Sequence, residues 1–131
     1  MSNLGDLVDR KLADQPEFAR AWMHAIERNL IDLDPWILFD SGEQVRARSH
    51  AINARYSGRE VLCFAERRDT DDVGCIVLGS NSDDSVGRVM IVHDFAKSGS
   101  EVDAIFSDFW EWFKGAVDDM IDTFTHWNDA L

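Results

Sequence analysis

Two stretches decide the fold: DDVGCIVL at residues 71–78 and GRVMIVHDF at residues 87–95. Both are short apolar runs, and the loop between them is rich in Ser, Asn, Asp and Gly. A third run, VLCFAE at residues 61–66, precedes them across the polar segment 67–72. Because short links join consecutive strands in an antiparallel way, these runs predict an antiparallel meander of at least three strands.

The segment after the strands predicts a long amphipathic helix from about residue 101 to about residue 127. Its apolar positions recur at helical spacing: Val102, Ile105, Phe106, Phe109, Trp110, Phe113, Val117, Met120, Ile121 and Phe124. Acidic residues gather on the opposite face, namely Glu101, Asp108, Glu111, Asp119 and Asp122. We expect the apolar face of this helix to anchor the sheet.

Two helices are predicted before the strands. The first follows from the helical spacing of Leu4, Leu7, Val8 and Leu12. The second begins near Asp14 and Pro16, with Asp14 as its cap, and carries an apolar stripe. That stripe consists of Phe18, Trp22, Ile26 and Leu30. This second helix should end before Asp34 and Pro35, because the residue before a proline avoids the helical conformation.

The connection between these helices and the meander is harder to interpret. Trp36 lies in a short apolar segment, residues 35–40, and we expect it to fill part of the core. Residues 45–56 alternate poorly and contain three arginines, so both a short edge strand and a brief helix remain open. The elements together predict an α+β fold, in which N-terminal helices and a long C-terminal helix pack on an antiparallel sheet.

Composition indicates one folded domain spanning residues 1–131. Hydrophobic residues make up 45% of the chain and aromatic residues 11%, which excludes a disordered protein. No apolar run approaches the roughly 20 residues of a membrane span, and the first residues lack the pattern of a signal peptide. We therefore expect a cytoplasmic protein, with Cys63 and Cys75 as buried free thiols in strands.

The charge is strongly and unevenly negative. The formal net charge is −12, and residues 101–131 hold eight acids and one base, which is −7. Such a surface disfavours direct binding to nucleic acid or to an anionic membrane. It favours a basic protein partner, although acidity that serves only solubility is also compatible with it.

The sequence contains no pattern that supports catalysis or a cofactor. Residues 69–74 resemble the start of a calcium loop, but Val73 and Ser80 stand where an EF-hand needs oxygen ligands, so we predict no metal site. His93 could act as a general base. However, neighbouring strand residues point to opposite faces, which keeps His93 and Asp94 apart. We expect no catalytic residue and no cofactor.

Trp112 is predicted to lie at the edge of the apolar face of the last helix, beside acidic residues. A half-exposed Trp in an acidic setting suits a contact with Arg or Lys of a partner. The alternative is that Trp112 packs on the N-terminal helices. The predicted partner-binding residues are Asp71, Asp72, Asp108, Glu111, Trp112 and Asp119.

Residues from about 58 to about 121 resemble the SUKH superfamily, the Smi–Knr type of cell-wall-assembly-regulator domain. The resemblance rests on GREVLCFA at 58–65, RRDTDDVGC at 67–75, VMIVHDFA at 89–96 and FWEWF at 109–113. It implies an α+β domain with a central antiparallel sheet. Many such proteins are non-enzymatic immunity proteins that bind and neutralise a cognate bacterial toxin, often a nuclease.

Three functions are therefore compared. The first is an immunity protein that covers a basic toxin domain. The second is a regulatory or scaffolding adaptor that has no toxin partner. The third is a hydrolase or metal-dependent enzyme built around Asp71, Asp72, His93 and Asp94, which is the least supported of the three.

Overall fold

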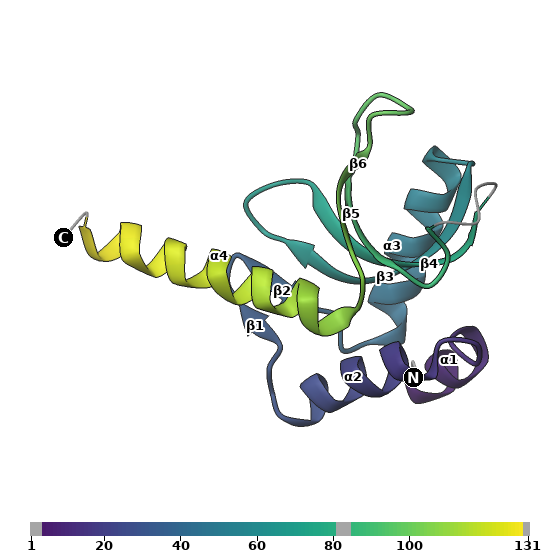
Figure 1. Cartoon of the computed structure of the whole chain (residues 1–131), viewed down its shortest axis with the longest axis horizontal. Coiled ribbons are helices and arrows are strands. Elements are labelled where there is room, and N and C mark those ends of the chain that lie inside the picture. Colours follow the sequence, from purple (N-terminus) through teal and green to yellow (C-terminus); the bar gives the residue numbers. More distant parts are fainter. Residues whose placement is uncertain (1–3, 81–84, 130–131) are drawn as a thin grey trace.

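A curved antiparallel sheet forms the centre of the computed structural model, which describes residues 4–80 and 85–129 (Figure 1). Its six strands lie in the sequential order β1-β2-β3-β4-β5-β6, so the predicted meander is confirmed and extended. The strands are β1 (Asp32–Leu33), β2 (Trp36–Leu38), β3 (Arg59–Arg67), β4 (Asp72–Ser80), β5 (Val89–His93) and β6 (Val102–Phe106). The loop predicted at 79–87 includes residues 81–84, which lie outside the described residues.

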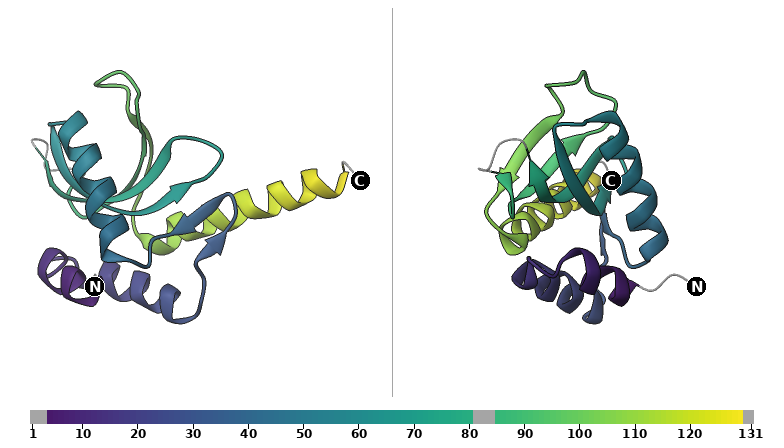
Figure 2. Two further views of the ribbon diagram at one scale, coloured as in Figure 1. Left: turned by 180° about the vertical axis from the view of Figure 1, so that it is seen from behind. Right: turned by 90° about the vertical axis from the view of Figure 1, so that its right-hand side faces the viewer.

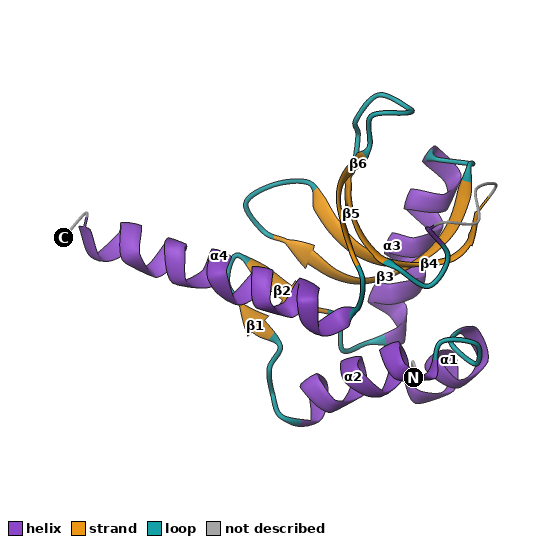
Figure 3. Ribbon diagram, viewed as in Figure 1, coloured by secondary structure: helices purple, strands orange, loops and turns teal. Residues whose placement is uncertain are grey.

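Four helices surround the sheet: α1 (Leu4–Lys11), α2 (Pro16–Glu27), α3 (Gly42–Arg55) and α4 (Phe109–Asp129). α3 covers one face of the sheet, while α2 and α4 pack on the other and α1 lies beside α2 (Figure 2). Both faces of β3 are therefore covered, which explains why residues 61–65 are all buried. In Figure 3 the helices form the outer layers and the strands the middle one. The predicted α+β fold is confirmed.

An aromatic cluster joins α2, α4 and the sheet. Phe64 of β3 lies 5.1 Å from Phe18 of α2 and 4.9 Å from Trp112 of α4, measured between ring centroids. Trp36, predicted to fill part of the core, is 1% exposed and stacks edge-on against Trp112 at 5.4 Å. Large aromatic side chains such as these dominate the energetics of a core.

Residues 45–56, which the sequence left open between strand and helix, belong to α3. The N-cap is Ser41, whose side-chain oxygen accepts hydrogen bonds from the amides of Glu43 and Gln44. Ser41 followed three residues later by Gln44 is the sequence signature of a capping box. The sequence contains this signature, but the apolar residues of the segment recur too irregularly to predict a helix.

The predicted start of the last helix was wrong. Residues 102–106 form strand β6, and α4 begins only at Phe109. Glu101 is 6% exposed and accepts a 2.7 Å hydrogen bond from Arg59, so it does not lie on a solvent-facing side of a helix. The apolar pattern of 102–106 fits both a strand and a helix, and pairing with β5 decides between them.

Two smaller expectations concern the N-cap of α2 and the two cysteines. The N-cap of α2 is Gln15, not Asp14, and no side chain caps it. Cys63 and Cys75 are fully buried free thiols, as expected, and face each other across β3 and β4 with 3.4 Å between their sulfur atoms.

Candidate functional site

The structure divides the six predicted partner-binding residues among three places. Trp112 is in the core, Asp108 and Glu111 are at the start of α4, and Asp71, Asp72 and Asp119 are near the turn that joins β3 to β4. They do not form one surface.

Trp112 is 1% exposed, so the expectation of a half-exposed Trp was wrong and the alternative of a packed Trp112 was right about its burial. Its ring packs against Trp36, Phe64 and Phe109. The helical projection placed it at the edge of the apolar face, but α4 turns that edge toward the sheet. Trp112 therefore contributes to packing and cannot contact a partner in this conformation.

Asp119 also faces the body of the protein. Its carboxylate accepts a 3.0 Å hydrogen bond from Nε1 of Trp36 and lies 3.5 Å from Nη1 of Arg67. The side chain is 36% exposed, so it still contributes negative charge to the surface. Its first role is to hold the middle of α4 against β2 and β3.

Asp108 and Glu111 accept hydrogen bonds at the start of α4. Asp108 accepts a 2.8 Å hydrogen bond from the Glu111 amide, and Glu111 accepts one from the hydroxyl of Ser107. Carboxylates suit this position because the first amides of a helix lack partners within the helix. Asp108 also lines a surface pocket of about 430 Å³ between α2 and the start of α4.

Asp71 and Asp72 end the turn that follows Arg67, whose guanidinium pairs with Asp69 at 2.7 Å. Asp71 is exposed, whereas Asp72 is half-buried and faces His93. The turn therefore carries its acids in two different settings, one in solvent and one within a cluster of side chains.

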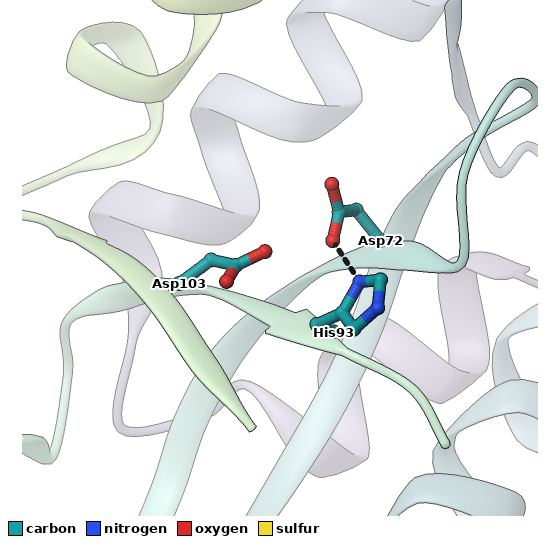
Figure 4. Close-up of side chains that lie close together, drawn as sticks. All are labelled: Asp72, His93 and Asp103. Atoms are coloured by element: carbon teal, nitrogen blue, oxygen red, sulfur yellow. Dashed lines mark hydrogen bonds and ion pairs between the residues drawn. The ribbon is translucent and has the colours of Figure 1, made fainter. Parts of the chain in front are cut away.

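That cluster consists of Asp72, His93 and Asp103, which come from three adjacent strands (Figure 4). Asp72 is paired with His93 in the register of β4 and β5, and its carboxylate lies 2.9 Å from Nδ1 of the imidazole. Asp103 comes from β6. One potential ligand atom from each side chain lies within 4.8 Å of the others. The sequence did not reveal this cluster, because Asp103 was assigned to a helix.

A bulge in β6 brings Asp103 to this place. Ile91 pairs with Ala104 and Val92 pairs with Val102, so Asp103 is the one residue left without a partner between them. Bulges of this kind redirect a side chain and are frequent beside functional sites.

The three groups alter one another's pKa values. Partial burial acts to raise the pKa of Asp72, but hydrogen bonds, first of all the one with His93, outweigh it and leave the pKa of Asp72 lowered. The hydrogen bond to Asp72 raises the pKa of His93. The pKa of Asp103 is also raised, first by its hydrogen bond to Asp72 and then by burial. His93 and Asp103 therefore keep their protons to a higher pH than separate side chains would, whereas Asp72 loses its proton more readily.

Asp94 lies on the opposite face of the sheet, as the alternation of strand side chains predicts. It is fully buried and accepts hydrogen bonds of 2.7 and 2.9 Å from Arg55. Burial raises its pKa, but the hydrogen bonds from Arg55 and from the Phe95 amide outweigh this effect and leave the pKa lowered. Asp94 thus anchors α3 and does not assist His93.

The second feature that sequence reasoning missed is an exposed apolar stripe on α4. Phe113, Val117, Ile121 and Phe124 follow one another at spacings of four, four and three residues, which aligns them on one side of the helix. Phe113 and Val117 are half-buried, whereas Ile121 is 52% exposed and Phe124 is 57% exposed. The outer turns of α4 extend beyond the other elements (Figures 1 and 2).

Comparisons of the chain with protein-family models, with curated proteins and with solved structures found no match. A proposal about function therefore rests on the geometry of the described residues. In residues 4–80 and 85–129, two features bear most on function: the polar Asp72–His93–Asp103 cluster and the apolar stripe of α4. Among the described residues, no helix is long and apolar enough to cross a membrane.

Proposed function

We propose that this chain is a non-enzymatic protein-binding domain whose principal contact surface is the outer half of α4, residues 117–125. The observation that carries the proposal is the exposure of Ile121 and Phe124 on the same helix whose earlier residues Phe109 and Ala116 are 1% exposed. A helix that lays apolar side chains into a partner's groove is a common mode of recognition.

Charge supports a basic partner. The exposed stripe lies on a helix that also carries Asp118, Asp119 and Asp122, and residues 101–131 have a formal charge of −7. Acidic side chains beside an apolar contact speed association with a basic surface and discriminate against acidic partners. The partner that fits has an apolar groove bordered by Arg or Lys.

The resemblance to the SUKH superfamily makes a bacterial toxin domain the first partner to test. Nuclease toxins have basic substrate-binding surfaces, so an acidic immunity protein would complement them. The proposal places the chain in the cytoplasm, where a reducing environment keeps thiols such as Cys63 and Cys75 free. A regulatory adaptor without a toxin partner is the alternative, and it would use the same surface.

The test is affinity capture from a lysate of the source cells with the tagged chain, at low salt and at about 0.5 M salt, where charge interactions are strongly screened. Three forms are compared: the wild-type chain, the double variant Ile121→Ser with Phe124→Ser, and the control Ile105→Ser. Ile105 is 48% exposed but lies on β6, so the control removes an exposed apolar side chain from a different element.

We expect the wild-type chain and the control to retain one basic protein that the double variant loses and that high salt releases. Mass spectrometry of the retained protein then separates a toxin domain from a housekeeping complex. Equal retention by all three forms would contradict the assignment of α4 as the contact surface. Retention that does not change with salt would contradict a basic partner.

A further inference from the structure

We propose that Asp72, His93 and Asp103 form a binding site for a divalent transition-metal ion, with Zn²⁺ as the first choice. The proposal does not depend on the function of α4. It rests on a mixed set of donors, one imidazole nitrogen and two carboxylates, that three different strands bring to one face of the sheet.

The spacing of the three donor atoms is close to that of the ligand atoms around a bound metal ion. Nδ1 of His93 already lies 2.9 Å from a carboxylate oxygen of Asp72, and the three donors lie within 4.8 Å of one another. Ligand atoms about 2.1 Å from zinc stand roughly 3–4 Å apart. The most widely separated donors therefore need to approach each other by about 1 Å before one ion can contact all three. Figure 4 shows both carboxylates directed toward the imidazole.

The backbone of the sheet places all three donors. Asp72 and His93 are directly opposite each other in the β4–β5 register. Asp103 is the extra residue of the β6 bulge, and the amide of His93 donates a 2.7 Å hydrogen bond to the carbonyl of Glu101, just before that strand. Sites built on strands are more rigid than sites built on loops.

The charge around the cluster favours a cation. Asp71 adds to the negative field at His93. Arg67 interacts electrostatically with Asp72, but its guanidinium donates to Asp69 and lies 3.5 Å from Asp119. Arg67 is thus held by other carboxylates, and a bound ion would be better placed to compensate Asp72 and Asp103.

The donors also indicate the class of ion. Imidazole nitrogen suits Zn²⁺ and other transition metals, whereas Ca²⁺ and Mg²⁺ prefer sites made only of oxygen. Three protein ligands leave at least one position of a tetrahedral ion open. Because the His93 side chain is 45% exposed, water or a group from a partner can reach that position.

The experiment is calorimetric titration of ZnCl₂ into the full-length chain, with any affinity tag removed, at about 0.15 M salt to screen loosely bound cations. Wild type is compared with His93→Gln and Asp103→Asn, and with His50→Gln as the matched control. His50 is exposed on α3, outside the cluster. Circular dichroism establishes that each variant is folded.

We expect one equivalent of Zn²⁺ to bind wild type and His50→Gln with the same affinity. The affinity of His93→Gln and of Asp103→Asn should fall by more than about tenfold, the loss commonly seen when a group near a metal is altered. Absence of saturable binding, or equal binding by His93→Gln and wild type, would overturn the proposal. Displacement of Zn²⁺ by an equal concentration of Ca²⁺ or Mg²⁺ would overturn the assigned class of ion.

Discussion

The inner and outer halves of α4 carry similar apolar side chains but lie in opposite surroundings. In the inner half, residues 109–116, Phe109, Trp112 and Ala116 are each 1% exposed. In the outer half, residues 117–125, Ile121 and Phe124 are more than half exposed. The comparison teaches that one amphipathic pattern packs where a helix crosses the sheet and leaves apolar side chains exposed where it extends past it, which is where we propose that a partner binds.

The largest expected effect is in the inner half. Replacing Trp112 with Ala should lower the free energy of unfolding by about 3–5 kcal/mol, because it removes contacts with Trp36 and Phe64 and leaves a cavity. Urea denaturation followed by circular dichroism measures the loss. Trp112→Phe is the control, since Nε1 of Trp112 has no hydrogen-bond partner and its removal breaks no hydrogen bond. A similar loss for both variants would contradict this account of the inner half.

A middle-sized effect is expected at Asp119, in the first turn of the outer half. Asp119→Ala should lower the free energy of unfolding by about 1–2 kcal/mol, because Nε1 of the buried Trp36 loses its acceptor. The neighbouring Asp118→Ala is the control and should change stability by no more than about 0.5 kcal/mol, since Asp118 is exposed. If the two variants proved equally stable, Asp119 would not hold the helix to the sheet.

The smallest effect on stability is expected in the outer half. The double variant Ile121→Ser with Phe124→Ser should change the free energy of unfolding by no more than about 0.5 kcal/mol, because Ile, Phe and Ser have similar helix propensities and both sites are largely in solvent. The same urea experiment measures it. A loss of several kcal/mol would show that these side chains pack against the protein.

Some elements of the fold could be predicted from the sequence and others could not. Strands β3, β4 and β5 and helix α2 follow from local signals, namely apolar runs, turn residues and helical spacing. The start of α4 was misplaced because residues 102–106 are apolar at positions that satisfy both periods. Only the pairing of that segment with β5 decides for a strand.

The candidate sites depended even more on distant contacts. An amphipathic pattern says which side of a helix is apolar, but it does not say where the sheet ends beneath it. Trp112 was therefore expected to be partly exposed, and Ile121 and Phe124 were expected to be buried. The cluster of Asp72, His93 and Asp103 was beyond prediction because it requires the register of three strands and a bulge.

The most direct test of the central claim is amide hydrogen exchange along α4, with and without the partner recovered by affinity capture. In the free protein, we predict slow exchange across the inner half and faster exchange across the outer half, which few contacts support. Addition of the partner should slow exchange in residues 117–125 and leave the inner half unchanged. Exchange in the outer half that stays the same when the partner binds would contradict the claim that this half of α4 is the contact surface.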